Sequence, residues 1–159
     1  MQQADTITVV IESEHAEGAG LDPTWLTHLL EFALRAESAP PSAVTLLVTD
    51  DDGIQTLHRD YLSDDTPTDV LSFAAQSDES FPIEPGYGDY LGDIAVSWDT
   101  AATQGPEAGL TAQHEVAFLA LHGLLHLLGA DDATETERAA MLDRQHALLA
   151  AFLALESHT

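Results

Sequence analysis

The chain has 159 residues, of which 45% are hydrophobic, and we expect a single domain over residues 1–159 with a buried core. It contains no cysteine, which excludes disulfides and Cys-ligated zinc, so any metal site must use His, Asp or Glu. Its 28 acidic residues and four arginines give a formal net charge of −24, which repels nucleic acid at long range.

Hydrophobic periodicity and turn residues predict nine elements. In chain order they are a strand over 6–11, a helix over 23–38, a strand over 43–49, a helix over 54–62, a strand over 70–74, a strand over 91–97, a short helix from 99 to about 105, a long helix over 112–128 and an amphipathic helix over 134–155. Residues 63–68 and 76–89 are predicted loops. The order predicts an α+β fold, with a single four-stranded mixed sheet packed against helices.

Several helix ends carry recognisable signals. Asp22 precedes Pro23 and is the expected N-cap of the first helix. The acidic run ending at Gly53 is a turn or a helix cap, and Asp99 is the expected cap of the short helix. Thr111 can cap the long helix, which is apolar nearly all round and should therefore be buried.

The acidic residues are scattered along the chain, which favours a solubilising surface; attraction of cations or of a basic partner is the alternative interpretation.

The first twelve residues lack the basic start and apolar middle of a signal peptide. No run approaches the roughly 18 apolar residues of a membrane span. We therefore expect a cytoplasmic protein that does not interact with membranes.

The segment from His122 to Asp132, HGLLHLLGADD, indicates a metal site on the buried helix. His122 and His126 are four residues apart and so share one helix face, where two imidazoles can reach one ion. Gly129 lets the chain turn back over the helix end, so that Asp132 can face the ion as a third ligand. Asp131 is the rival third ligand. The expected cofactor is one divalent ion, with zinc favoured.

This spacing is that of the metzincin zinc proteases, with Asp in the third position, so the site is zincin-like. Zinc proteases have a glutamate general base where this chain has Gly123, so a peptidase is disfavoured. Glycine inside a helix suggests close approach of another backbone or of substrate. Hydrolysis then needs another proton acceptor, for which Asp131 and the polar loop 66–69 are candidates.

Three blocks of the sequence resemble the YbeY family of bacterial endoribonucleases, which act in ribosomal RNA maturation. The first is HGLLHLLGADD, ending at Asp132. The second runs from Leu57 to Phe73 and includes Tyr61 and PTDVLSF, and the third is LGDI from Leu91, with Ser97 following. The resemblance implies the α+β fold and a metal-dependent hydrolase of single-stranded RNA. It also implies partnership with the small ribosomal subunit or its proteins in the maturation and quality control of its RNA.

The chain departs from the family pattern at two positions. The family's third ligand is usually His where this chain has Asp132, which should make bound water less acidic. The family commonly has an arginine directly after Tyr61, facing RNA phosphate, where this chain has Leu62. Arg59, one helical turn back, is a candidate substitute and catalytic residue, although it can also be an ordinary solvated residue.

The remaining histidines have simpler readings. His58 and His114 are candidates for a role near the site, whereas the other four are expected at the surface: His15, His28, His146 and His158.

The alternative to an endoribonuclease is a non-catalytic ribosome-assembly factor with a structural metal, and the acidic composition and the missing arginine favour it. The zinc peptidase is the third hypothesis, and Gly123 argues against it.

Overall fold

The computed structural model describes residues 5–12, 21–64, 68–74 and 89–157. Its four strands form one mixed sheet in the order β1-β2-β4-β3. They are β1 (Thr6–Glu12), β2 (Ser42–Thr49), β3 (Val70–Ala74) and β4 (Asp89–Ser97). β1, β2 and β4 are parallel neighbours, and β3 runs antiparallel to β4 at the far edge. The predicted α+β class and mixed sheet are therefore confirmed.

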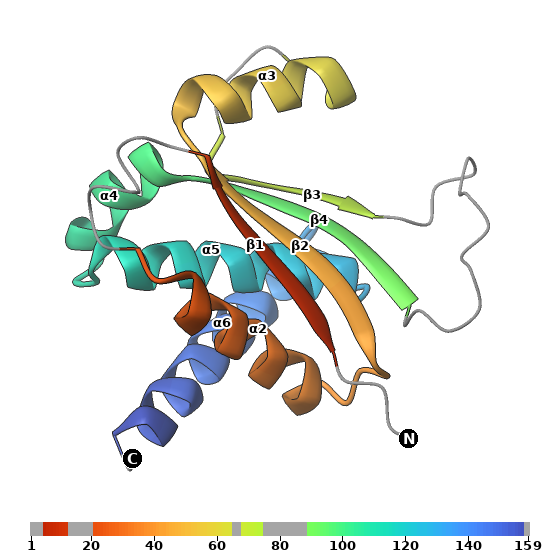
Figure 1. Cartoon of the computed structure of the whole chain (residues 1–159), viewed down its shortest axis with the longest axis vertical. Helices are drawn as coiled ribbons and strands as arrows, with labels where there is room; N and C mark the ends of the chain where they lie inside the picture. The colour runs from red at the N-terminus through yellow and green to blue at the C-terminus, as the bar shows by residue number, and fades with distance from the viewer. Residues whose placement is uncertain (1–4, 13–20, 65–67, 75–88, 158–159) are drawn as a thin grey trace.

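The described residues contain five helices that pack around the sheet: α2 (Pro23–Ala36), α3 (Asp51–Leu62), α4 (Trp98–Glu107), α5 (Ala112–Leu127) and α6 (Glu135–Glu156). Figure 1 shows α2, α5 and α6 on one face of the sheet and α3 on the other. The predicted order of elements is confirmed. Among the described residues, no helix combines the length and apolar character needed to cross a membrane.

The helix caps explain why most boundaries could be predicted. The Asp22 carboxylate accepts hydrogen bonds from the backbone N–H groups of Thr24 and Trp25, at 3.0 and 3.2 Å. Thr134 and Glu137 form a capping box that fixes the first turn of α6. The acidic run after β2 is a cap, because the Asp50 carboxylate accepts from the Gly53 N–H at 2.8 Å. α3 therefore begins at Asp51, three residues before the predicted start.

The prediction that Asp99 caps α4 is wrong. Ser97 is the N-cap, and its hydroxyl accepts from the Thr100 N–H at 3.2 Å. The Asp99 carboxylate instead accepts from the backbone N–H of Asp51 at 2.9 Å. It thus supports the start of α3 rather than of its own helix, a long-range contact that local sequence does not reveal.

The core lies between the sheet and the layer of α2, α5 and α6. It contains aliphatic residues from the strands, such as Leu46 and Ile94, and from α5, such as Leu121 and Leu124, all fully buried. A β-carbon added at Gly123 would lie 2.6 Å from Ile94 Cγ2. Gly123 therefore allows α5 to pack closely on β4. The close neighbour is a side chain of the sheet, not another backbone.

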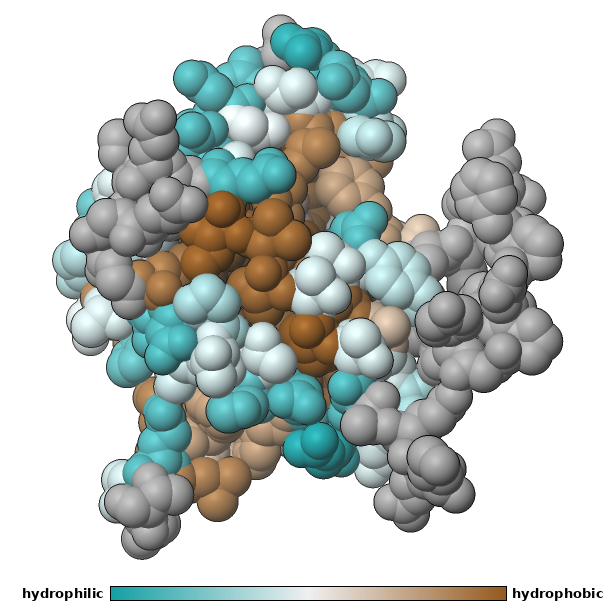
Figure 2. All heavy atoms as spheres, viewed as in Figure 1, coloured by the Kyte–Doolittle hydropathy of each residue, from teal (hydrophilic) through white to brown (hydrophobic). Residues whose placement is uncertain are grey.

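The opposite face of the sheet is only partly covered, by α3. Hydrophobic residues gather over the strands in Figure 2, surrounded by polar ones. A cavity of about 380 Å³ on this side is lined by residues from the strands and from α3, among them Tyr61 and Phe73. Their rings pack edge to face with centroids 5.5 Å apart. These two residues of the second family block thus lie across the sheet from α5.

Candidate metal centre

Helix α5 brings the two predicted imidazoles together. Thr111 caps the helix by accepting from the His114 N–H at 3.1 Å, and nine residues of the helix are buried against the core. His122 and His126 lie one turn apart on the same face, and their Nε2 atoms are separated by 3.1 Å. Each side chain is 25% exposed, so the pair lies at the edge of the core.

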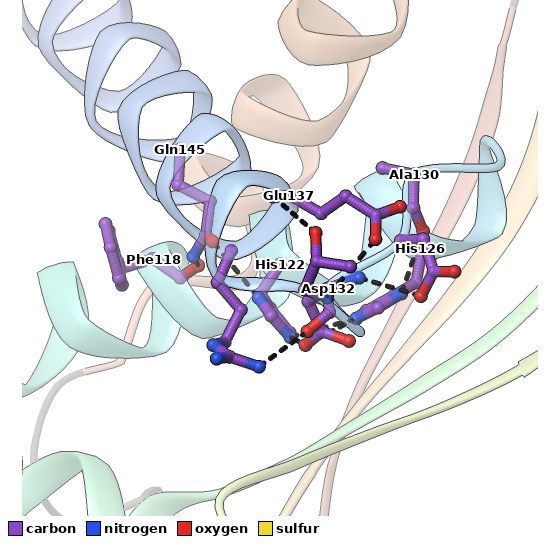
Figure 3. Close-up of polar contacts among 10 residues, drawn as sticks. Phe118, His122, His126, Ala130, Asp132, Glu137 and Gln145 are labelled. Carbon is purple, nitrogen blue, oxygen red and sulfur yellow. Dashed lines mark hydrogen bonds and ion pairs between the residues drawn. The ribbon is translucent and has the colours of Figure 1, made fainter.

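The turn after α5 supplies the third side chain. Gly129 adopts a φ of +106°, which favours glycine, and the N–H of Ala130 donates to Leu125 O at 2.9 Å. The chain reverses there, and Asp132 Oδ2 lies 3.6 Å from His122 Nε2 and 3.4 Å from His126 Nε2. Figure 3 shows the Asp132 carboxylate facing both rings. The spacing therefore predicted this convergence correctly.

Hydrogen bonds at the far side of each ring determine where its proton lies. His126 Nδ1 is 3.0 Å from Ala130 O, and a carbonyl only accepts, so this nitrogen carries the hydrogen. Gln145 donates its amide N–H to Phe118 O at 3.1 Å, which leaves its Oε1 to accept from His122 Nδ1 at 3.0 Å. With these tautomers, each Nε2 is the nitrogen that can bind a metal ion, and Figure 3 shows the two Nε2 atoms facing each other.

The donor set fits a divalent ion. Two imidazole Nε2 atoms and a carboxylate oxygen lie 3.1–3.6 Å apart, so a cation among them would be held by three electron-pair donors. Tetrahedral zinc with bonds of roughly 2.0–2.1 Å places its ligands about 3.3–3.4 Å apart, close to the three separations observed. Among the described residues, these three form the group of His, Asp and Glu side chains that could hold a metal.

Asp131 directly precedes Asp132, but its carboxylate binds the backbone and does not face the two imidazoles. Its Oδ1 accepts a hydrogen bond from the backbone N–H of Asp132 at 2.8 Å. It also lines a separate cavity of about 240 Å³ together with Glu37 and Arg144. The geometry therefore favours Asp132 over Asp131 as the third ligand.

Arg59 lies on α3, across the sheet from α5 (Figure 1). Its Nε is 3.2 Å from Asp60 Oδ1, and its side chain is 52% exposed. The neighbouring His58 lies 3.6 Å from the Asp64 carboxylate. The structure thus places both residues away from the two imidazoles.

The other described histidines have packing roles or lie at the surface. The His114 ring stacks on Trp25 with centroids 5.5 Å apart, and the His146 ring packs on Phe118. His28 is exposed. His15 and His158 lie outside the described residues. His114 is therefore part of the contact between α5 and α2.

A cavity of about 220 Å³ adjoins the histidine pair, and sequence analysis missed most of its polar lining. It is bounded by His122 and Gln145 and by two carboxylates, Asp69 and Glu115. Glu115 is only 6% exposed, and this burial, followed by the charge of Asp69, raises the pKa of its carboxyl. Asp69 comes from the predicted polar loop 66–69, of which residues 66 and 67 lie outside the described residues.

Gln145 is the other residue that sequence analysis missed. It lies on the apolar face of α6 with Met141, Leu148 and Leu149, and it is 1% exposed. A glutamine within an otherwise apolar stripe was the available signal, because a buried amide needs hydrogen-bond partners. The identity of those partners depends on the packing of α6 against α5.

The fold and the site together define a class: an α+β protein whose buried helix and following turn present a His-His-Asp group suited to one metal ion. The model of the family described as "Endoribonuclease YbeY" matches residues 13–153, so the chain belongs to the YbeY family. Three comparisons illustrate the similarity.

The chain is 42% identical to an endoribonuclease YbeY of Roseiflexus castenholzii over 135 residues, which cover 84% of this chain and 85% of the relative. It is 46% identical to that of Moorella thermoacetica over 131 residues, covering 79% and 83%. The solution structure of TM1509 from Thermotoga maritima matches with a TM-score of 0.62 at 20% identity, covering 96% of this chain and 93% of that one. This last comparison supports the fold alone.

Proposed function

We propose that this protein is a zinc-dependent endoribonuclease that cuts single-stranded RNA in the maturation and quality control of small-subunit ribosomal RNA. Family membership supports the reaction class, because the relatives are named endoribonucleases. The proposed partners are ribosomal RNA and the small subunit or its proteins, which implies a cytoplasmic location. The proposed ligands of the ion are His122, His126 and Asp132.

The observation that carries this proposal is a three-ligand group at the molecular surface. The Asp132 side chain is 39% exposed, and both imidazoles are partly exposed. Structural zinc sites normally use four protein ligands, whereas catalytic ones use three and leave a position for water or substrate. The chemistry that such an ion supplies is Lewis acidity, which makes water ionisable near neutral pH and polarises a phosphoryl oxygen.

The chain's own residues prepare the ligands and accept protons. Gln145 and the Ala130 carbonyl hold the two rings by Nδ1 and leave each Nε2 turned toward Asp132, so the rings would need little reorientation to bind an ion. Asp131 remains the proposed proton acceptor, because it is exposed and directly precedes the ligand Asp132. Asp69 is the second candidate, because it shares a cavity with His122. The pH–rate profiles of Asp131→Asn and Asp69→Asn decide between them.

Arg59 remains a proposed RNA-contacting residue. Its position across the sheet means that it would contact RNA away from the metal-binding group. Cleavage by Arg59→Met, measured at several RNA concentrations, tests this role. A raised KM supports contact with RNA, and unchanged kinetics refute it.

The alternative function is a non-catalytic ribosome-assembly factor in which the ion is structural. The net charge of −24 favours this alternative, because it opposes RNA binding. An RNA cleavage assay at high salt, comparing wild type with His126→Ala, separates the two functions. His28→Ala is the matched control, because it removes an exposed histidine from α2. The enzymatic proposal expects cleavage to be lost only in His126→Ala; cleavage that persists without His126 contradicts it.

A further inference from the structure

The guanidinium group of Arg138, an exposed residue in the first turn of α6, lies next to the proposed metal ligands. Arg138 Nη1 donates a hydrogen bond to the backbone oxygen of Asp132 at 3.2 Å. Asp132 is the residue whose carboxylate faces both imidazoles. A fixed positive charge is therefore anchored on a proposed metal ligand.

The local backbone holds Arg138 in this position. The Glu137 N–H donates to Thr134 Oγ1 at 3.1 Å, and the Thr134 N–H donates to Glu137 Oε1 at 3.2 Å. This capping box fixes the first turn of α6, where the Arg138 N–H donates to Thr134 O at 2.9 Å. A basic residue near a helix N-terminus opposes the helix dipole, so stability of α6 does not account for an arginine here.

Arg138 also differs from the other arginines in its partners. Arg35 is 3.7 Å from Glu31, Arg59 is 3.2 Å from Asp60, and Arg144 donates to Glu37 at 2.6 Å. Within the described parts of the chain, Arg138 has no carboxylate within ion-pair distance, and its residue is exposed. No carboxylate of the described residues thus neutralises its positive charge.

The donors of Arg138 suit a phosphate group. A guanidinium has five N–H donors in a planar fork, and the contact to Asp132 uses only one nitrogen. The remaining donors can bind two oxygens of one phosphodiester side by side. In a chain of net charge −24, a positive group next to the bound ion would create a local region that attracts an anion.

We infer that Arg138 binds a phosphodiester group of the RNA strand at the metal centre and so positions the strand for cleavage. This inference rests on the proposed function, because it assumes that RNA approaches the three ligands. Loss of this contact should weaken RNA binding about tenfold, as is typical for a charged hydrogen bond at a binding site. It should also remove one phosphate contact from the salt dependence of binding.

The test uses Arg138→Met, which removes the charge while keeping much of the side-chain length, and Arg138→Lys, which keeps the charge without the fork. Arg35→Met is the matched control, because it removes the same charge from α2. The probe is a fluorescein-labelled, 2′-O-methylated ten-nucleotide oligouridylate, followed by anisotropy from 50 to 300 mM salt with zinc-loaded protein. A gel at the end of each titration checks that the probe is intact. Chelator competition measures zinc affinity for each variant.

We expect Arg138→Met to bind the probe about tenfold more weakly and to reduce the magnitude of the salt slope by about 0.7. Arg138→Lys should keep the slope and lose part of the affinity. Arg35→Met should match wild type, and zinc affinity should stay within twofold in all variants.

Two results would overturn the inference. One is identical RNA affinity and slope for Arg138→Met and Arg35→Met. The other is a fall in zinc affinity that accounts for weaker RNA binding, which would mean that Arg138 only holds the Asp132 turn. If Arg138→Met does not fold, wild-type RNA affinity in a folded Arg138→Lys protein overturns the inference instead. Failure of wild type to cleave RNA would instead refute the proposed function.

Discussion

Gln145 Oε1 lies 3.0 Å from His122 Nδ1, and this hydrogen bond joins α6 directly to α5. The glutamine is itself oriented, because its amide N–H donates to Phe118 O. The position of α6 therefore determines which nitrogen of His122 is available to a metal ion. If these side chains bind an ion as proposed, their affinity for it should depend on Gln145, which would not touch the ion.

Replacing Gln145 with leucine should weaken metal binding. Loss of the acceptor frees the His122 ring to rotate and to change tautomer, and such supporting residues typically contribute 10–100-fold in affinity. Gln145→Glu keeps an acceptor for Nδ1 and should retain more of the affinity. Competition with a fluorescent chelator measures both. Wild-type zinc affinity in a folded Gln145→Leu protein would show that the hydrogen bond is unimportant.

Asp132→Asn and Asp131→Asn form a matched pair that tests the third ligand. A ligand at 100 times its dissociation constant stabilises the native state by about 2.7 kcal/mol. Zinc should therefore raise the Tm of wild type and of Asp131→Asn, but much less that of Asp132→Asn. Differential scanning calorimetry with and without zinc gives the answer. The reverse pattern would assign the ligand to Asp131.

Gly123→Ala should destabilise the protein even though alanine is the better helix former by roughly 1 kcal/mol. The added methyl group would lie 2.6 Å from Ile94 Cγ2, and a β-branched side chain on a packed strand cannot easily move away. We expect a net loss of about 1–3 kcal/mol in the free energy of unfolding, measured with urea.

A double-mutant cycle provides the control for this clash. In an Ile94→Ala background the methyl group of Gly123→Ala has space, so the second substitution should cost little or be stabilising. Equal costs of Gly123→Ala in both backgrounds would mean that Ile94 is not the obstacle.

Glu115→Gln should stabilise the fold at neutral pH. The folded-state pKa of Glu115 is raised above its ordinary value of 4.5, first by burial and then by the charge of Asp69. The folded state therefore holds this proton more tightly than the unfolded state, and its stabilising effect is lost as the pH rises from 4.5 through the raised pKa. Thermal unfolding at pH 4 and pH 7 should show a benefit of Glu115→Gln only at pH 7.

Glu107→Gln is the control for this comparison, because Glu107 is exposed on α4. Its effect on the Tm should be small and similar at the two pH values. A benefit of Glu115→Gln that is equal at pH 4 and pH 7 would contradict a pKa raised by burial.

The order of elements could be predicted because helix caps and hydrophobic periodicity are local features. Asp22 and Thr111 each cap the helix that follows them, as expected. The convergence of His122, His126 and Asp132 was also predictable, since helical spacing and a glycine turn determine it. Asp99 could not be assigned, because it caps a helix that lies 48 residues earlier in the chain.

The supporting residues of the site could not be identified for a similar reason. Periodicity indicates that residue 145 faces the core, but not that its amide meets the ring of His122. The burial of Glu115 and the contact of Arg138 with Asp132 likewise depend on how α5, α6 and the intervening turn pack. Sequence spacing therefore predicted which three side chains converge, whereas tertiary packing supplies the groups that orient them.

The central claim is that one ion is held by His122, His126 and Asp132, and X-ray anomalous scattering from crystals grown with zinc tests it most directly. Data collected on both sides of the zinc absorption edge identify the element and locate it. We predict one peak per chain within roughly 2.0–2.2 Å of His122 Nε2, His126 Nε2 and an Asp132 carboxylate oxygen. A zinc-loaded crystal with no peak among these three side chains would contradict it.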